Sequence, residues 1–287
     1  MGTIEATLDG VQSSSRNPAI VDNDRQAISL FKRIRCIRGS VLVTELNKAR
    51  VLIAGGSSGI GLATAKILHS KGAVVAISGR SQDKLDATQA VLGRDVETFA
   101  FDAMDAEARS RALAEVGSID HLVIALSGGK AAGPISTLAQ TDLEGGFQAK
   151  FFAHFGLARD ALKHLSETGS ITFVSAISAR AANPGTSGLS AINAAIEGLV
   201  RPLAVELRPC RLNAVSPGVI DTPWWDWMPD DQKAVAFQNF ASATPVGRVG
   251  QPEDIAHAIT FLIENSFMTG TVIECDGGLR LTGTSLS

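Results

Sequence analysis

The stretch Val51-Leu-Ile-Ala-Gly-Gly-Ser-Ser-Gly-Ile-Gly61 decides the fold of this chain. Its apolar beginning predicts a short buried strand, and its glycines and serines predict a turn. After Ile60, apolar residues at helical spacing (Ala63, Ile67 and Leu68) predict a helix that begins as the turn ends. This order leaves main-chain N–H groups at a helix N-terminus, where they and the helix dipole favour a pyrophosphate. We therefore interpret the stretch as a dinucleotide-binding site.

The glycines of this turn have separate physical reasons. Gly55 permits the tight turn, Gly59 lets the main chain approach the phosphates, and Gly61 lets the helix pack closely on the strand. A glycine pattern alone also suits an ordinary turn, so the interpretation depends on the strand before it and the helix after it. The expected cofactor contacts here are Gly55, Ser57, Ser58, Gly59, Ile60 and Gly61.

Composition limits the class of protein. The chain has 287 residues, of which 45% are hydrophobic and 19% charged, and its net charge is −3. This length and apolar content suit one α/β domain, and the mild negative charge gives no reason to expect nucleic acid or an anionic membrane as partner. No apolar run is long enough for a transmembrane helix. The three cysteines are far apart and odd in number, so we expect no disulfide framework, no metal site and a reduced cytoplasmic protein.

Residues 1–47 differ in composition from the remainder of the chain. A polar, turn-prone stretch at 13–18 precedes a basic segment at 26–38, whose apolar residues suit a short amphipathic helix against a partner or membrane surface. The segment lacks the uninterrupted apolar core of a signal peptide. We favour a disordered tail, or upstream sequence included by a misplaced start with translation beginning near Val43.

From Lys48 onward, predicted strands and helices alternate, which indicates a parallel sheet covered by helices on both faces. Strands are expected at 51–54, 74–78, 97–101, 121–126, 170–174, 211–215 and 271–274. Helices are expected at about 60–71, 82–92, 105–115, 143–166, 189–207 and 252–264. No repeat or linker interrupts the pattern. We therefore predict one α/β domain over 48–287, a Rossmann fold with a doubly wound, seven-stranded parallel sheet.

The end of the second predicted strand indicates which dinucleotide binds. An acidic residue there would accept hydrogen bonds from the adenosine ribose, but Gly79 and Arg80 occupy the position. Arg80 and the Ser81 hydroxyl suit a 2′-phosphate, so we expect NADP(H) in preference to NAD(H), the alternative being an ordinary surface arginine. After the third strand, Asp102, followed by Ala103, either accepts a hydrogen bond from the adenine amino group or caps a helix or turn.

Three motifs together resemble the short-chain dehydrogenase/reductase family. Residues 54–61 resemble its TGxxxGIG motif, and residues 248–281 resemble its C-terminal helix and last strand. Pro217-Gly218-Val-Ile-Asp-Thr222 resembles the PG-then-Thr segment that holds the nicotinamide end in that family. The resemblance spans about 48–281 and implies a nicotinamide-dependent oxidoreductase with a small-molecule substrate. It also implies cofactor contacts from Pro217, Gly218, Ile220 and Thr222.

The positions that match the family's catalytic residues are changed in this chain. The family's YxxxK helix continues with a pattern that this chain matches, which places Leu189 at the tyrosine position and Asn193 at the lysine position. The serine position falls on Ala176, just after Ser175, and the family's helix asparagine falls on Lys150. The chain contains no tyrosine, so no shift of the alignment can supply one.

The exchange of lysine and asparagine suggests a replacement for the missing acid. Lys150 would keep a cation near the nicotinamide ribose, and burial would lower its pKa, so that it could donate a proton or polarise a carbonyl. The alternative is a solvent-facing lysine on an amphipathic helix. We take Lys150, Ser175 and Asn193 as the candidate catalytic residues, with Ser178 as a further polar candidate.

The region after the PG segment carries all three tryptophans, at positions 224, 225 and 227. In the family this region is a mobile lid over the substrate, and clustered aromatic side chains there favour a flat or apolar substrate. The alternative is packing against the core or a second subunit. Ser127, Trp224 and Trp225 are expected to line the substrate pocket.

The apolar stretch Phe147–Phe155 carries two more expectations. His154 follows Lys150 by one helical turn, but its phenylalanine neighbours favour a packed or interface histidine over a proton shuttle. This helix and the one at 189–207 resemble the pair through which family members associate. A homodimer or homotetramer is therefore expected.

The leading hypothesis is an atypical NADP(H)-dependent oxidoreductase acting on a small, mainly apolar carbonyl or alcohol. Loss of a positioned general acid costs roughly 10²–10⁴-fold in rate while leaving cofactor binding intact. Two alternatives follow from the changed residues. One is a cofactor-binding enzyme for proton transfer or isomerisation, and the other is a non-catalytic nucleotide-binding or partner subunit.

Overall fold

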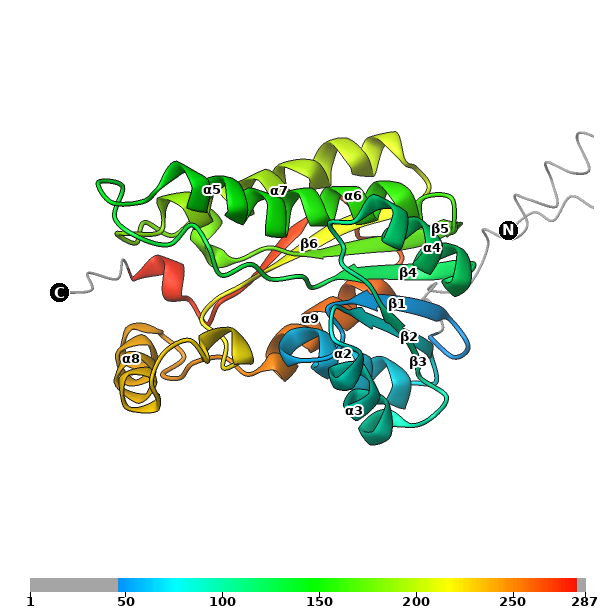
Figure 1. Ribbon diagram of the computed structural model, residues 1–287, viewed down its shortest axis with the longest axis horizontal. Helices are drawn as coiled ribbons and strands as arrows, with labels where there is room; N and C mark the ends of the chain where they lie inside the picture. The colour runs from blue at the N-terminus through cyan, green and yellow to red at the C-terminus, as the bar shows by residue number, and fades with distance from the viewer. Residues whose placement is uncertain (1–45, 283–287) are drawn as a thin grey trace, which may run out of the picture. The chain divides into compact units, whose positions relative to one another are not determined.

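The computed structural model describes residues 46–282 of the chain (Figure 1). The prediction for residues 1–47 therefore lies, except for its last two residues, outside the described part. One parallel sheet has the strand order β3-β2-β1-β4-β5-β6-β7. Its strands are β1 (Arg50–Ala54), β2 (Val74–Gly79), β3 (Glu97–Ala100), β4 (Ile119–Ile124), β5 (Leu165–Val174), β6 (Arg211–Pro217) and β7 (Val272–Cys275). The predicted seven-stranded parallel sheet is confirmed.

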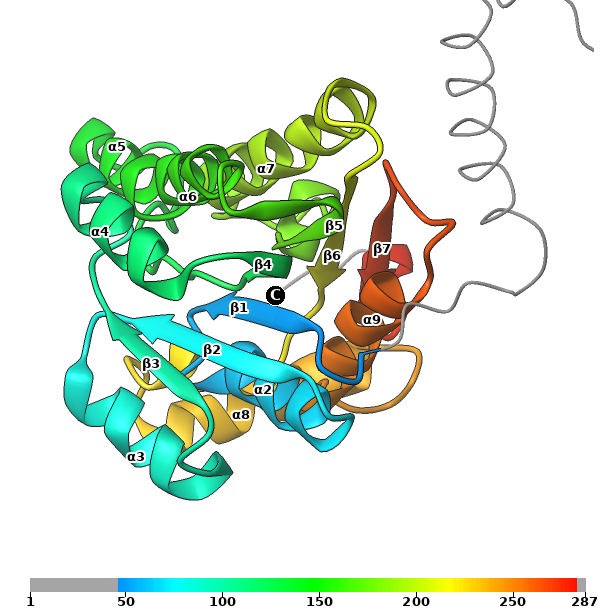
Figure 2. The same ribbon diagram turned by 90° about the vertical axis from the view of Figure 1, so that its right-hand side faces the viewer.

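Helices cover both faces of the sheet, as predicted for a doubly wound fold. Figure 2 shows α4, α6 and α7 on one face and α2, α3 and α9 on the other. The helices are α2 (Gly59–Ser70), α3 (Gln82–Leu92), α4 (Ala106–Val116), α5 (Gln140–Gly146), α6 (Ala153–Ala161), α7 (Ser187–Glu206), α8 (Asp230–Ala243) and α9 (Pro252–Glu264). Among residues 46–282, no helix is long and apolar enough to cross a membrane.

The strands have apolar side chains on both faces because each face packs against a helical layer. Ile53 belongs to the core on one face, together with Leu68 of α2 and Ile259 of α9. Leu52 belongs to the core on the other face, together with Leu157 of α6. All of these side chains are fully buried. The sheet is therefore a rigid platform whose strand ends carry the loops of the site.

The order of the strands in the sheet determines where a ligand site is expected. Strands β2 and β3 lie on one side of β1, and β4 to β7 lie on the other. The loops after β1 and β4 therefore diverge at a topological switch point, where open α/β sheets bind ligands. These loops touch, because a Cβ built on Gly55 would lie 2.7 Å from the carbonyl oxygen of Ala125. Gly55 also has a φ of +82°, which favours glycine.

The single helix predicted at 143–166 is wrong. The structure has α5, then a π-helical turn η1 (Phe147–Phe152), then α6, and β5 already begins at Leu165. Nδ1 of His154 forms a 2.8 Å hydrogen bond with the main-chain oxygen of Lys150. A side chain that bonds to a helix carbonyl disturbs the regular i to i−4 ladder, which accounts for the wider turn here.

The segment after β6 also differs from the sequence-based expectation. A 3₁₀ turn η3 (Pro223–Trp225) is followed by α8, in a region that we interpreted as an irregular lid. Pro229 precedes α8, and Asp230 and Asp231 occupy its first turn, which are ordinary helix-start signals. No residue of α8 is buried, and its apolar residues do not gather on one face of the helix. The sequence therefore carried a start signal for this helix without a clear core-facing stripe.

Candidate functional site

The N-terminus of α2 provides a site for a pyrophosphate. Gly59 begins the helix with a φ of +50°, and the preceding Ser58 has extended main chain and makes no side-chain capping bond. Gly61 packs so closely that a Cβ there would lie 2.1 Å from the carbonyl oxygen of Gly55. The first-turn N–H groups are therefore left for an anion, with Ser57 and Ile60 partly exposed beside them. These residues fit a dinucleotide.

The segment that resembles the family's nicotinamide-binding motif lies against this turn. A Cβ built on Gly59 would lie 3.2 Å from the methyl carbon of Thr222. Pro217 ends β6 and is buried, and Ile220 is 6% exposed. Gly218 is partly exposed at the same edge of the sheet. The structure thus brings the glycine turn and the PG-then-Thr segment together, although they are far apart in the sequence.

The predicted adenosine contacts lie at the ends of β2 and β3. Arg80 is exposed and, within the described part of the chain, makes no hydrogen bond or ion pair. The Ser81 hydroxyl caps α3. Oδ1 of Asp102 accepts a 2.9 Å hydrogen bond from the main-chain N–H of Met104, as expected for a turn residue, and this bond leaves the predicted adenine contact untested. Ala103 is buried. Contacts of these residues with a nucleotide stay predictions.

The three candidate catalytic residues come together at the C-terminal end of β5. Lys150 lies on η1, and its Nζ donates hydrogen bonds to Oδ1 of Asn193 on α7 at 2.7 Å and to the main-chain oxygen of Ser175 at 3.1 Å. The side chain therefore points inward, and the solvent-facing alternative is wrong. Ala176 and Leu189, which we expected at the family's serine and tyrosine positions, carry no side-chain polar group.

Burial sets the charge state of this group. It lowers the pKa of Lys150 from its usual 10.5 to about 8, although the nearby Glu197 carboxylate acts in the opposite direction. His154 is fully buried, and burial, assisted by the Lys150 charge, lowers the pKa of His154 to about 3. The predicted packed histidine is confirmed. Lys150 is therefore the ionisable group of this cluster that titrates nearest to neutral pH.

The Ser175 hydroxyl points away from Lys150. Its Oγ donates a 2.9 Å hydrogen bond to Oε1 of Glu197, and the residue is 3% exposed. Only the main-chain oxygen of Ser175 contacts the ammonium group. The sequence predicted Ser175 as a site residue. It did not predict the direction of the hydroxyl, which depends on Glu197 of α7, a residue that was not among the candidates.

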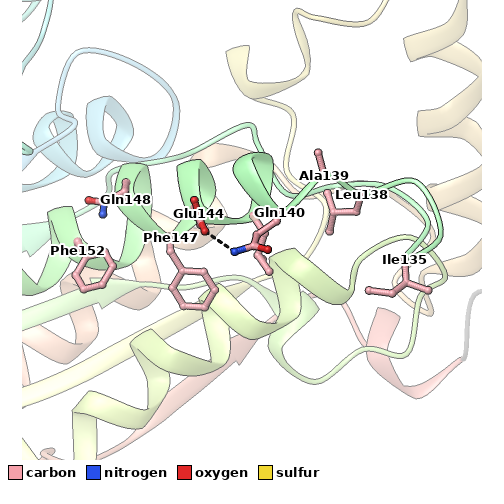
Figure 3. Close-up of a pocket in the computed structure, with 9 residues that line it drawn as sticks. Ile135, Leu138, Ala139, Gln140, Glu144, Phe147, Gln148 and Phe152 are labelled. Atoms are coloured by element: carbon pink, nitrogen blue, oxygen red, sulfur yellow. Dashed lines mark hydrogen bonds between the residues drawn. The ribbon is translucent and has the colours of Figure 1, made fainter.

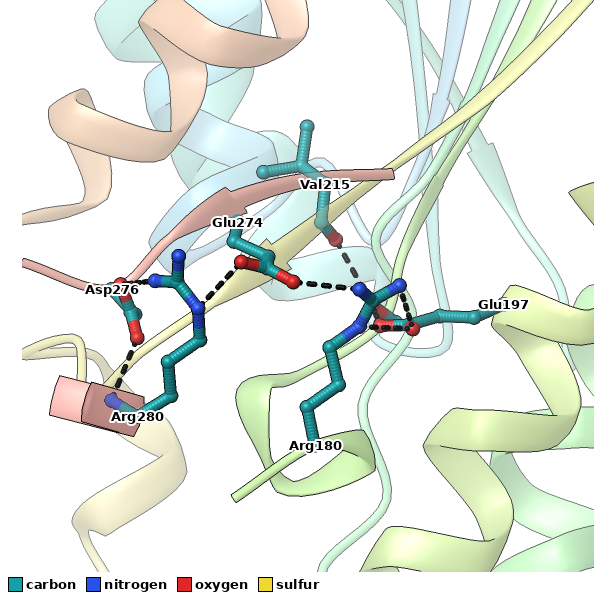
Figure 4. A network of polar contacts seen from close by, with 7 residues as sticks. Arg180, Glu197, Val215, Glu274, Asp276 and Arg280 are labelled. Atoms are coloured by element: carbon teal, nitrogen blue, oxygen red, sulfur yellow. Dashed lines mark hydrogen bonds and ion pairs between the residues drawn. The ribbon is translucent and has the colours of Figure 1, made fainter. Parts of the chain in front are cut away.

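A chain of ion pairs continues from Glu197 to the end of the fold (Figure 4). Arg180 pairs with Glu197 at 2.8 Å and with Glu274 of β7 at 2.6 Å. Arg280 pairs with Glu274 and, at 2.9 Å, with Asp276. The network ties the loop after β5 to α7 and β7. Glu197 also accepts the hydrogen bond from Oγ of Ser175, so the network includes this residue.

Asn193 uses both ends of its carboxamide. Its Oδ1 accepts from Lys150, while its Nδ2 donates to the main-chain oxygen of Leu189 at 2.9 Å and to Oγ of Ser178 at 3.1 Å. The residue is 3% exposed. Because a carbonyl oxygen only accepts and an ammonium group only donates, the orientation of this amide is settled by its partners.

Two of the tryptophans connect loops of the site. Nε1 of Trp224 donates to the main-chain oxygen of Gly128 at 3.2 Å, which links the segment after β6 to the loop after β4. The ring of Trp225 packs edge to face against Phe237 of α8, with centroids 5.6 Å apart. Ser127 is exposed. The position of the Trp225 side chain is therefore explained by packing on α8. The Trp224 side chain connects the segment after β6 with the loop after β4, as expected for a lid.

A separate hollow of 610 Å³ lies on the outer side of α5 and η1 (Figure 3). Its lining is mainly apolar and includes Ile135, Leu138, Phe147 and Phe152. None of the predicted cofactor or catalytic residues lines it. Across residues 46–282, no three His, Cys, Asp or Glu side chains form a group that could hold a metal ion.

Known proteins resemble this chain over nearly all of its described length. The family model described as Enoyl-(Acyl carrier protein) reductase matches residues 54–280. The 3-oxoacyl-[acyl-carrier-protein] reductase FabG of Rickettsia prowazekii (strain Madrid E) is 31% identical over 247 residues, which cover 83% of this chain and 99% of that protein. The chain belongs to the short-chain dehydrogenase/reductase family.

Other members resemble this short-chain dehydrogenase/reductase to a similar degree. The cis-4-hydroxycyclohexanecarboxylate dehydrogenase of Sinomonas cyclohexanicum is 33% identical over 242 residues, covering 79% of this chain and 94% of that protein. A crystal structure of a small-chain dehydrogenase in complex with NADPH is 33% identical, with a TM-score of 0.71 over 82% of this chain and 100% of that chain. This protein is therefore an oxidoreductase of the family and uses a nicotinamide cofactor.

Proposed function

We propose that this protein is an NADP(H)-dependent oxidoreductase for small, mainly apolar carbonyl compounds or alcohols, in which Lys150 replaces the family's tyrosine. The observation that carries the proposal is the 2.7 Å hydrogen bond between Nζ of Lys150 and Oδ1 of Asn193. It holds the partly buried Lys150 ammonium group at the C-terminal end of β5. The absence of tyrosine from the whole chain makes some other proton donor necessary.

The residues present also support the choice of cofactor. The α2 N-terminus suits a pyrophosphate, and the exposed guanidinium of Arg80 suits a 2′-phosphate. An NADPH complex of a 33% identical relative is consistent with this choice. NADPH, when bound, supplies a hydride to the carbonyl carbon.

The proton that completes a carbonyl reduction comes from Lys150. Below pH 8 its ammonium form predominates, so Nζ donates a proton to the substrate oxygen and then regains one from water. Asn193 and the main-chain oxygen of Ser175 orient the ammonium group. In the direction of alcohol oxidation, the neutral amine accepts the hydroxyl proton. Ser127, Trp224 and Trp225 are the proposed lining of the substrate pocket.

Thermal stability in the presence of cofactor tests the nucleotide choice. NADPH at about 100 times its Kd should stabilise the fold by about 2.7 kcal/mol, and NADH at the same concentration should have little effect. The midpoint should then rise by roughly 5–10 °C. Arg80→Ala should abolish the difference between the two nucleotides, because it removes the cation that pairs with the 2′-phosphate.

The matched control for this titration is Arg94→Ala. Arg94 is also an exposed arginine, but it lies before β3 at the opposite edge of the sheet. This variant should respond to NADPH as the unmodified protein does. Equal stabilisation by both nucleotides would refute the proposed role of Arg80 in binding the 2′-phosphate. No stabilisation by either nucleotide would refute the proposed binding of NADP(H).

A second candidate is proton transfer or isomerisation without redox chemistry. A lysine whose pKa lies near 8 supplies both a general acid and a general base at neutral pH, which favours this alternative. Two probe ketones separate the possibilities. Ethyl acetoacetate carries the 3-oxoacyl group and cyclohexanone the six-membered ring of the compounds on which two relatives act. Ketone-dependent loss of NADPH absorbance supports the redox proposal. Exchange of the ketone's α-hydrogens with deuterated water that is faster than in a sample without the protein, and without NADPH consumption, supports the second candidate.

We also propose that the protein is a homodimer or homotetramer that associates through the face of η1 and α6. Phe152 and Phe155 are 46% and 40% exposed on this face, and the apolar hollow of Figure 3 lies beside them. Exposed aromatic side chains around a hollow are typical of surfaces that another chain covers.

The double variant Phe152→Ser, Phe155→Ser should therefore weaken this association. Light scattering coupled to gel filtration should give the mass of a dimer or tetramer for the unmodified protein and a smaller assembly for the variant. Val91→Ser is the control, because Val91 is 72% exposed on α3. A double variant with unchanged mass would place the interface elsewhere.

A further inference from the structure

The loop after β5 holds a hydroxyl group that no function assigned so far uses. Ser178 lies in the 3₁₀ turn η2 (Ile177–Ala179). This turn directly follows Ala176, the residue expected at the family's serine position. Oγ of Ser178 receives the 3.1 Å hydrogen bond from Nδ2 of Asn193. Because the Asn193 amide is oriented by Lys150 and by the main chain of Leu189, Ser178 Oγ acts as acceptor in this bond.

The hydroxyl hydrogen of Ser178 consequently remains unused. No acceptor for it is found within residues 46–282, and the residue is only partly buried. A hydroxyl that already accepts a hydrogen bond from an amide directs its own O–H elsewhere. Ser178 is therefore a donor aimed away from the protein groups that hold it.

Lys150 offers a second donor, which contacts the same carboxamide. Its ammonium group has three N–H bonds, and the described part of the chain supplies two acceptors, Oδ1 of Asn193 and the main-chain oxygen of Ser175. The same carboxamide thus holds the cation at one end and the hydroxyl at the other. Asn193 therefore contacts both donors, the charged one through Oδ1 and the neutral one through Nδ2.

We propose that the Ser178 hydroxyl and the Lys150 ammonium group together bind the oxygen of the substrate carbonyl. A carbonyl oxygen has two lone pairs, and each donor can occupy one of them. The negative charge that grows on this oxygen during hydride transfer strengthens both bonds, which is how a pair of fixed donors lowers a barrier. Ser178 donates a hydrogen bond and exchanges no proton, so the proton balance stays with Lys150. This inference rests on the proposed redox function.

The test compares Ser178→Ala with Ser178→Thr in the NADPH-dependent reduction of cyclohexanone and ethyl acetoacetate. Ser178→Ala should lower kcat about 10²-fold, the typical effect of removing one oxyanion donor, with a much smaller change in KM. The isotope effect with NADPH deuterated at the transferred hydrogen should rise, because hydride transfer becomes slower relative to product release. Ser178→Thr retains a hydroxyl and should retain most of kcat.

Two controls separate this role from a structural one. Ser110→Ala removes an exposed hydroxyl on α4 and should change nothing. Ser178→Ala should also keep the NADPH-induced thermal shift and the fall of kcat/KM above pH 8 that deprotonation of Lys150 should cause.

Three outcomes would overturn the inference. The first is a Ser178→Ala variant with kcat within about twofold of the unmodified protein. The second is a loss of activity that follows the loss of NADPH binding. The third is an unmodified protein that binds NADPH but oxidises it with neither ketone, which overturns the proposed redox function as well.

Discussion

Lys150→Met is expected to lower kcat for reduction of the two probe ketones about 10²–10⁴-fold, which corresponds to about 3–5.5 kcal/mol of barrier. Methionine matches the length of the apolar stem but has no proton to donate and no charge to place near the substrate oxygen. The NADPH-induced thermal shift should decrease only in part, because the substitution removes the cation expected near the nicotinamide ribose and leaves the turn between β1 and α2 intact. Pre-steady-state absorbance measurements check whether the hydride step itself slows.

The pH dependence distinguishes an acid from a fixed charge. The pKa of Lys150 is lowered to about 8, so its protonated fraction is nearly complete at pH 6 and falls through pH 8. At saturating NADPH, kcat/KM for the ketone should therefore be level below the pKa and fall about tenfold per pH unit above it. In Lys150→Met this break should be absent. The oxidation of an alcohol should show the opposite slope, because it needs the neutral amine.

Lys163→Met is the matched control. Lys163 is an exposed lysine between α6 and β5, at the opposite edge of the sheet from Lys150. Its substitution should leave kcat, KM and the pH profile unchanged. A Lys150→Met variant that keeps both the rate and the break would refute the replacement of tyrosine by lysine.

Gly61→Ala is the second substitution with a large expected effect. An alanine Cβ there would lie 2.1 Å from the carbonyl oxygen of Gly55 and 3.0 Å from Cα of Gly56, so α2 must move away from the end of β1. Forced overpacking typically costs about 1–3 kcal/mol, or roughly 2–10 °C in the melting midpoint. The same movement displaces the N–H groups that would bind the pyrophosphate. Differential scanning fluorimetry with and without NADPH should show a lower midpoint and little or no response to the nucleotide.

Gly198→Ala provides the comparison. Gly198 also lies in a helix, α7, but nothing comes within 4 Å of a Cβ built on it. Alanine is the better helix former by about 1 kcal/mol, so this variant should melt at the same temperature or higher and respond normally to NADPH. A Gly61→Ala variant with the same behaviour would show that close packing of α2 on β1 is not required.

The parts of the fold that the sequence predicts well depend on local patterns. β1, its turn and α2 lie within residues 50–70, so strand period, glycine pattern and helical spacing all describe neighbouring residues. The π-helical turn was missed because it follows from one contact, that of His154 with the Lys150 carbonyl, which leaves no mark on periodicity. Helix α8 was missed because it buries no residue and its apolar stripe is weak.

The sequence likewise predicts some features of the candidate site and misses others. A comparison of positions 150 and 193 with the family pattern predicts a displaced cation, and the geometry brings those two side chains within 2.7 Å. The direction of the Ser175 hydroxyl follows from Glu197, and the role of Ser178 follows from the orientation of one amide. Both depend on hydrogen-bond partners from other elements, which residue spacing does not reveal.

The distribution of aromatic residues makes the segment after β6 optically distinct. The chain has no tyrosine, and all three of its tryptophans lie within residues 224–227. The intrinsic ultraviolet emission of the whole protein therefore comes almost entirely from one short segment that is bonded to the loop after β4 through Trp224. Trp227 is 67% exposed, so dissolved quenchers can reach the part of the fluorescence that it emits. Trp225 packs against Phe237 of α8 and is shielded from them. Movement of this segment on ligand binding can thus be followed by fluorescence in the unmodified chain, without a label.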